Sequence, residues 1–267
     1  MEFNFNPNEL ILERIRAVEA YNPATDELIG RLTQIEEPVL ETSATALDVV
    51  DAMGTPIHTF YNAQQGKFSG SSSLFSLDLA ASQFGAEKVV ATSDKKITMY
   101  ASETITIGSD ATVVLKHVPV GTAGAEIKYV KVINDNNTFG ETFEVATAAG
   151  AGKFTLNAAT KTITLPEGTT GRVFVNYAYE SDNAVSITKT TDAIPEVQKL
   201  LIHAIFHDPC DANLVYAGII VCPRAQLDPT AISLSLKSDG KHPFSYALKK
   251  PYCADSAKLF DILVSRD

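Results

Sequence analysis

Hydrophobic and polar residues alternate in short runs along most of the chain, and Gly, Pro, Asn and Asp separate the runs at intervals of about ten residues. Alternation with a period of two is typical of a β-strand that has one face in the core. β-Branched and aromatic residues, which favour strands, fill most of these runs. The pattern therefore predicts a mainly β protein.

The N-terminal part is predicted to form a hairpin over residues 15–35, in which Asn22 and Pro23 begin the turn between IRAVEAY and LIGRLTQI. A short helix behind an Asn8 cap is the alternative. Its apolar face would consist of Leu10, Ile11, Ile15 and Val18. Both interpretations stay open for the first twenty residues.

Residues 36–70 contain two predicted strands, VLETSA and PIHTFYNAQQGKFSG, joined by TALDVVDAMGT. This connection is too long for a tight hairpin turn, so a long loop is expected from Thr42 to Thr55. The loop carries several apolar side chains, which either contact another chain or pack on the subunit's own core. These side chains are Leu47, Val49, Val50 and Met53.

One helix is predicted among the strands, in the segment SSSLFSLDLAASQFG. Ser73 is the expected N-cap, and Gly85 is expected to end the helix in a left-handed conformation. The helical period places four apolar residues on one face, namely Leu74, Leu77, Ala81 and Phe84.

From about Lys95 the composition shifts toward Thr, Val, Ala and Gly, and six or seven short strands are expected up to Thr190. This number of strands suits an immunoglobulin-like β-sandwich in the architectural sense. Four or five more strands follow, with a tight turn expected at Ser238-Asp239-Gly240. These last strands are too few for a core of their own. We therefore expect one discontinuous domain, residues 1–94 with 191–267, and an inserted sandwich at 95–190.

The charge of the chain narrows the possible partners, because 32 acidic side chains against 22 basic ones give a net charge of −10 and a pI near 5.0. A surface of that sign repels phosphate, which argues against tight nucleic-acid binding but suits a conduit through which DNA slides. The first twenty residues lack the pattern of an export signal, and no stretch has the roughly 18 consecutive apolar residues of a membrane span. No membrane insertion is expected.

Each candidate catalytic or metal-binding motif departs from the pattern that its chemistry requires. The segment TAAGAGKFT departs from a phosphate-binding loop at Thr147 and Phe154. His203 and His207 lie on a predicted strand, where residues four apart are separated by about 13 Å, too far for one metal ion. Cys210, Cys222 and Cys253 are odd in number and lack the CxxC spacing, so buried thiols are expected.

Nucleophile and acid–base patterns are equally weak. Ser71, Ser72 and Ser73 stand before a helix without a nucleophile elbow, and helix capping explains them. Carboxylates such as Glu36 and Asp48 would suffice for sugar cleavage, but the chain has no Trp to form a sugar-binding groove. We expect a non-enzymatic protein without cofactor or metal, which works by assembling with copies of itself.

In its outer segments the chain resembles the bacteriophage major tail tube family. The resemblance lies in residues 28–85, where a strand, the connection around ALDVVDAMGTPI, a strand ending in KFSGSSS and the helix LFSLDLAASQFG follow one another. It continues in AISLSLKSDGKHPFSYALKKPYC and a last strand. The resemblance implies a tail-tube-like β-barrel or sandwich domain with one flanking helix, and the inserted sandwich would face outward.

The resemblance also implies a role. Copies would close into rings, rings would stack into a tube, and DNA would pass through the lumen without specific binding. The partners would be the chain itself and other tail proteins, and the subunit would assemble in the host cytoplasm into the virion. The long loop would contact the next ring through Leu47, Asp48, Val49, Val50, Asp51 and Met53. Two alternatives stay open, another virion part such as a capsid decoration or baseplate protein, and a carbohydrate-binding module.

Overall fold

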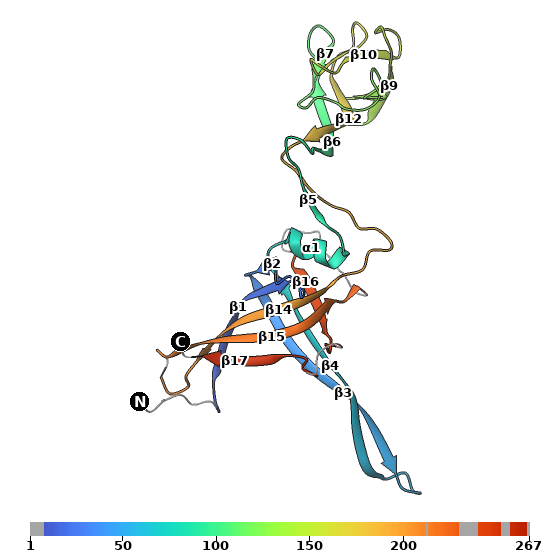
Figure 1. Ribbon diagram of the computed structural model, residues 1–267. Coiled ribbons are helices and arrows are strands. Elements are labelled where there is room, and N and C mark those ends of the chain that lie inside the picture. The colour runs from blue at the N-terminus through green and yellow to red at the C-terminus, as the bar shows by residue number, and fades with distance from the viewer. Residues whose placement is uncertain (1–7, 212, 230–239, 252–256, 266–267) are drawn as a thin grey trace. The chain divides into compact units, whose positions relative to one another are not determined.

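The computed structural model describes residues 8–211, 213–229, 240–251 and 257–265. Strands dominate these residues, and α1 (Leu77–Phe84) is the one α-helix within them, which confirms the mainly β class. The chain divides into two compact units (Figure 1), one formed by Met1–Lys88 with Ile187–Asp267 and the other by Val89–Ser186. Residues 230–239, which include Ser238 and Asp239 of the predicted tight turn, lie outside the described residues.

β1 (Ile11–Tyr21) and β2 (Leu28–Leu32) form the predicted N-terminal hairpin. The side-chain oxygen of Asn22 accepts a hydrogen bond of 2.9 Å from the amide of Ala24, which shapes the turn. β1 pairs with β14 along its length, so the helical alternative for this segment is wrong. Pairing on both sides satisfies the backbone near Val18, and its side chain is buried in the core of the sheet.

One antiparallel sheet forms most of the first unit, in the order β2-β1-β14-β15-β16-β4-β3, with β17 also paired to β15. Thr33 and Gln34 join its two end strands, and β3 also contacts β1, so the sheet curls into a nearly closed barrel. The remaining strands of this sheet are β3 (Ile35–Val50), β4 (Pro56–Ser72), β14 (Val197–His207), β15 (Val215–Leu227), β16 (His242–Leu248) and β17 (Asp261–Ser265).

The core of the first unit lies on the inner face of this sheet, because its strands bury every second side chain. In β14 the buried residues include Leu200 and Ile202, while their neighbours along the strand are half-buried. β16 alternates in the same way. The inner face joins residues from six strands and the helix in one cluster, whose largest members are Leu32, Phe68, Leu79, Leu200, Ile202, Leu227, Phe244, Tyr246 and Leu248.

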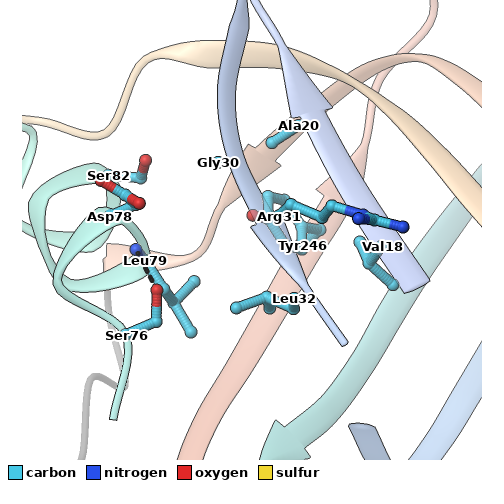
Figure 2. Close-up of a pocket in the computed structure, with 10 residues that line it drawn as sticks. All are labelled: Val18, Ala20, Gly30, Arg31, Leu32, Ser76, Asp78, Leu79, Ser82 and Tyr246. Atoms are coloured by element: carbon cyan, nitrogen blue, oxygen red, sulfur yellow. Dashed lines mark hydrogen bonds between the residues drawn. The ribbon is translucent and has the colours of Figure 1, made fainter. Parts of the chain in front are cut away.

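α1 begins three residues later than predicted. Ser76, not Ser73, is the N-cap, and its hydroxyl accepts a hydrogen bond of 3.2 Å from the amide of Leu79 (Figure 2). The predicted apolar face is also wrong in part, because Leu74 and Leu77 are exposed whereas Leu79 is 4% exposed. Figure 2 shows Leu79 on the side of the helix that faces β2. Gly85 ends the helix in a left-handed conformation, as expected.

His242 connects the helix to β16. Its Nε2 donates a hydrogen bond of 2.8 Å to Oε1 of Gln83, and its Nδ1 accepts one of 3.3 Å from the amide of Ser76. The Gln83 side chain also donates to the carbonyl of Pro243 at 2.7 Å. The imidazole is therefore neutral, and burial lowers its pKa. The ring also stacks on Phe75, with 4.9 Å between the centroids.

The second unit has its own sheet, in the order β6-β12-β8-β9-β10-β11-β7, and its two end strands contact each other. Its core cluster shares no residue with that of the first unit. β9 and β10 pair in parallel, and an immunoglobulin-like arrangement stays a prediction. The strands are β6 (Ile97–Thr106), β7 (Thr112–Val114), β8 (Tyr129–Ile133), β9 (Phe139–Val145), β10 (Lys153–Asn157), β11 (Thr162–Thr164) and β12 (Arg172–Ser181). A two-stranded ribbon, β5 (Lys88–Val90) with β13 (Val185–Ile187), lies at the boundary of the units in sequence.

A buried polar group stabilises this second core. The hydroxyl of Tyr177 donates a short hydrogen bond to Glu103, and the amide of Lys116 donates to the same carboxylate at 3.3 Å. The amide of His117 donates to the Tyr177 hydroxyl at 3.1 Å. Burial, together with the Glu103 carboxylate, raises the pKa of Tyr177 to about 12. These bonds hold the segment after β7 against the sheet.

Candidate assembly surfaces

The first surface is a long hairpin formed by β3 and β4. β16 pairs with β4 only over Gly66–Ser72, so beyond this point the two strands pair with each other alone. We call residues 42–65 the hairpin arm; nine strand residues from Thr42 to Val50 extend for about 30 Å. Figure 1 shows the arm projecting from the barrel.

The long loop predicted from Thr42 to Thr55 is therefore wrong as a structure. Leu47, Asp48, Val49 and Val50 lie within β3, and only residues 51–55 form a turn. Cross-strand pairs such as Leu47 with Phe60 and Asp48 with Thr59 hold the arm together. Pairing supplies backbone partners that the segment's own weak strand propensity does not predict. The role of these residues in contacts between rings stays a prediction.

Asp51 organises the turn at the tip. Its Oδ1 accepts hydrogen bonds from the amides of Met53 at 2.8 Å and Thr55 at 2.9 Å. Gly54 follows with a φ of 85°, a conformation that glycine adopts without strain. The tip places the side chain of Met53 in solvent, where it is 91% exposed.

Exposed apolar side chains lie on both faces of the arm, and one of these faces also carries a carboxylate. Leu47 and Phe60 form a cross-strand pair, and both are more than half exposed. The other face carries Asp48, whose carboxylate accepts a hydrogen bond of 2.5 Å from the Thr59 hydroxyl. The exposed apolar side chains of the arm are Leu47, Val49, Val50, Met53, Ile57, Phe60 and Tyr61. A projecting element with this much exposed apolar surface is typical of a protein–protein contact.

The second surface is the end of the barrel sheet that β2 and β16 do not reach. Here four antiparallel strands lie side by side in the order β1-β14-β15-β17. One row of paired residues crosses all four, formed by Ile15, Ala204, Gly218 and Val264. We call this the four-stranded segment and define it as residues 11–17, 203–207, 215–221 and 261–265.

Among the residues that the structure describes, both outer strands of the four-stranded segment have an unpaired edge. β2 pairs with β1 only over Val18–Tyr21, so residues 11–17 have a described strand on one side alone. Within the described part of the chain, β17 pairs with β15 and with no other strand. Unpaired edges present backbone N–H and C=O groups to any strand that fits them.

Exposed apolar side chains gather on the same strands. Ile11 and Leu12 in β1 are 54% and 53% exposed, and Ile262 and Leu263 in β17 are each 56% exposed. Val215 in β15 is 52% exposed and pairs with His207, which in turn pairs with Ile11. Open edges and unburied apolar side chains thus coincide in one region.

Charged residues cross the outer face between β1 and β14. His203 Nε2 lies 3.1 Å from Glu19, and His207 Nε2 lies 2.7 Å from Glu13. The hydrogen bond with His207 lowers the pKa of Glu13. Although burial raises the pKa of Glu19, hydrogen bonds from Tyr21 and His203 bring it below its ordinary value. The two histidines thus contact different carboxylates, as expected for residues four apart on a strand.

The other candidate sites have ordinary structural surroundings. Cys222 is buried, as expected, and burial raises the pKa of its thiol to about 12. The prediction of a buried thiol is wrong for Cys210, which is exposed. Cys253 lies outside the described residues. Within the described ranges, His, Cys, Asp and Glu form no group of three or more that is placed to hold a metal ion. The same residues include no helix with the length and hydropathy needed to cross a membrane.

Sequence reasoning found the apolar residues of the arm but missed the four-stranded segment. Its strands were predicted singly, but their pairing joins residues about 200 positions apart, such as Ile15 and Ala204. The sequence carries one signal of an exposed edge. Ile262 and Leu263 are neighbouring apolar residues that point to opposite faces of a short strand.

Comparison with known proteins identifies the family of the chain. No curated protein matches the chain. The model of the YomU/Tube protein family matches residues 10–250, which is most of both units. The chain therefore belongs to the YomU/Tube protein family and is a phage tube-type structural protein, a component of the virion.

Proposed function

We propose that the protein is the subunit of a phage tail tube, in which copies close into rings and the rings stack around a lumen for DNA. The observation that carries this proposal is the four-stranded segment with its two open edges. A subunit that exposes one strand edge on each side joins head to tail with its own copies. Such contacts close into a ring when the rotation between copies allows it.

The direction of the strands supports this ring. β1 is antiparallel to β14, β14 to β15, and β15 to β17. β17 of one copy therefore runs antiparallel to β1 of the next copy when the two meet in a continuous sheet. The pairing would cover residues 11–17 and 261–264 and bury the exposed side chains of Ile11 and Leu263. A closed barrel has no strand edges left to aggregate.

The hairpin arm supplies the contact between rings. It extends about 30 Å from the last residue that β16 pairs, so it reaches beyond its own subunit. Its exposed apolar face, with Leu47, Val49 and Phe60, gains free energy when another copy covers it. The proposed contact residues are those expected from the resemblance, Leu47, Asp48, Val49, Val50, Asp51 and Met53.

DNA would pass through the lumen without specific binding, because the net charge of −10 repels phosphate. The role is non-enzymatic and needs no cofactor. The second unit has a separate core, so it would face outward without taking part in ring closure. Assembly would take place in the host cytoplasm.

Electron microscopy in negative stain tests this function directly. We expect purified protein to form rings or hollow tubes as its concentration rises. A protein that stays monomeric at high concentration would overturn the proposal, and small closed oligomers without tubes would favour a decoration or baseplate role.

Hydrogen exchange locates the ring contact. Amides in residues 11–17 and 261–264 should exchange slowly in rings and rapidly in monomers, because edge pairing removes them from water. Residues 89–186 serve as the internal control and should exchange equally in both states. Protection confined to other strands would mean that the ring closes elsewhere.

A further inference from the structure

A pocket rich in arginine lies beside the open edge of β1. It is lined by Arg14, Ile15, Arg16, Arg31, Thr33, Gln34 and Ile35. Three of the chain's six arginines thus meet in one place, in a protein whose net charge is −10. Guanidinium groups gathered in this way favour an anionic occupant, and the two isoleucines favour an occupant that is also partly apolar.

The three arginines differ in how far the subunit itself neutralises them. Arg31 Nε lies 3.1 Å from Glu19, and Arg14 Nε lies 3.6 Å from Glu13. The described residues supply no ion pair to Arg16, whose side chain is exposed. Arg16 is also the extra residue of a bulge, since the register of β1 against β14 shifts between Ile15 and Ala17. Bulges turn a side chain out of the regular alternation of a strand.

The hairpin arm has the complementary charge. The sequence contains no Lys or Arg between Arg31 and Lys67, and the distal part of the arm carries Asp48 and Asp51. The carboxylate of Asp51 is engaged in the turn, with the amides of Met53 and Thr55. Asp48 has the Thr59 hydroxyl as its partner and lies on an exposed strand. Its carboxylate therefore has sites left for a guanidinium.

We propose that the arginine pocket receives the hairpin arm of a second copy of this chain, with Asp48 of one copy beside Arg16 of the other. This inference rests on the proposed tube and assigns the surface that the arm contacts in the next ring. Edge pairing within a ring uses the backbone of β1, whereas the contact with the arm uses the arginine side chains. The pocket thus joins ring closure and ring stacking at one place.

Passing DNA is the other anion that an arginine pocket attracts. The arm fits better than DNA, because it offers exposed apolar side chains to Ile15 and Ile35 as well as the Asp48 carboxylate to the arginines. A strongly held phosphate would also hinder DNA movement through a tube.

A charge exchange in the full-length protein tests the contact. Asp48→Lys and Arg16→Glu should each raise the protein concentration needed for tubes by at least about tenfold, because like charges meet at every subunit. The double variant, and an equimolar mixture of the two single variants, should form tubes again, since each restores opposite charges. Asp182→Lys and Lys249→Glu, at exposed positions, are the matched controls and should assemble normally.

The outcomes separate the two proposals. Thermal unfolding of each variant at low concentration checks that the exposed substitutions leave the fold intact. If the single variants assemble normally, or if neither the double variant nor the mixture recovers, the assigned contact is wrong while the tube function stands. If Arg16→Glu weakens binding of double-stranded DNA and leaves assembly unchanged, the pocket serves DNA and the contact is overturned. A wild-type protein that forms neither rings nor tubes overturns both proposals.

Discussion

Nε2 of His242 and Oε1 of Gln83 lie 2.8 Å apart in the interior of the first unit, although 159 positions separate the two residues in sequence. The bond joins the helix α1 to β16 and requires a neutral imidazole, because Nδ1 of the same ring accepts from Ser76. Protonation of the His242 imidazole would therefore weaken the contact between α1 and β16.

Stability should fall on mild acidification because of His242. Burial lowers its pKa below the ordinary 6.5, so between that folded-state pKa and 6.5 the unfolded chain binds more protons than the folded one. The free energy of unfolding should thus be fully present above pH 6.5 and decrease as the pH falls below it. Urea unfolding between about pH 7 and pH 5 measures this slope.

The variant His242→Asn should show a shallower slope over the same range, at lower overall stability. His58→Asn is the matched control, since His58 is exposed on the hairpin arm and its loss should leave the slope unchanged. Glu13 and Glu19 also have lowered pKa values, but they lose their stabilising effect only as the pH falls below about 4.5. An equal slope in wild type and His242→Asn would contradict the role given to the imidazole.

Leu79→Ala should destabilise the first unit by about 2–5 kcal/mol, because it removes a buried side chain beneath α1 and leaves a cavity. Leu77→Ala, on the same helix, should cost no more than about 0.5 kcal/mol, since Leu77 is 42% exposed. Chemical denaturation of the two variants measures the difference. Equal losses would mean that the helix packs through the face predicted from its sequence pattern.

Replacing residues 89–186 with a short Gly/Ser linker should leave the first unit folded and able to form rings. The two cores share no residue, and β5 with β13 marks the junction at which the chain leaves and re-enters the first unit. Circular dichroism and negative-stain microscopy of the shortened chain measure both properties. Loss of rings by a shortened chain that still unfolds cooperatively would give the second unit a part in assembly.

Tyr177→Phe should destabilise the second unit by about 1–3 kcal/mol, because the buried Glu103 carboxylate and the amide of His117 both lose a partner. Tyr100→Phe removes a hydroxyl from a side chain that is 77% exposed and should change little. Thermal unfolding of the isolated Val89–Ser186 unit or of the full chain measures the difference in Tm.

The local sequence pattern predicts much of this fold, and the predictions that are wrong share a cause. Alternation identified the strands, and Gly85 gave the end of the helix. The start of the helix was misplaced because Ser73 and Ser76 are equally good caps by sequence. The choice depends on the contact between the amide of Ser76 and His242, 166 positions away. Tertiary contacts of this kind override local preference.

The two candidate surfaces also combine features that local sequence predicts with features that only tertiary pairing determines. The sequence predicts a loop in the hairpin arm because TALDVVDAMGT is too long for a tight hairpin turn, whereas the pairing of β3 with β4 extends both strands through it. Its apolar and acidic residues were recognised. The open edges of β1 and β17 depend on which strands lie beside them, and no local pattern contains that information.

The two bulges of β1 bear on the width of the proposed lumen. Glu13 and Arg16 are extra residues relative to β14, and each bulge bends its strand and increases its twist. In a ring of identical segments, the bend of each segment sets the angle between neighbours, and that angle divides the circle into a whole number of subunits. In the proposed ring, deleting one bulge residue would straighten β1 and change this angle, so the register of one strand would set the bore of the proposed tube.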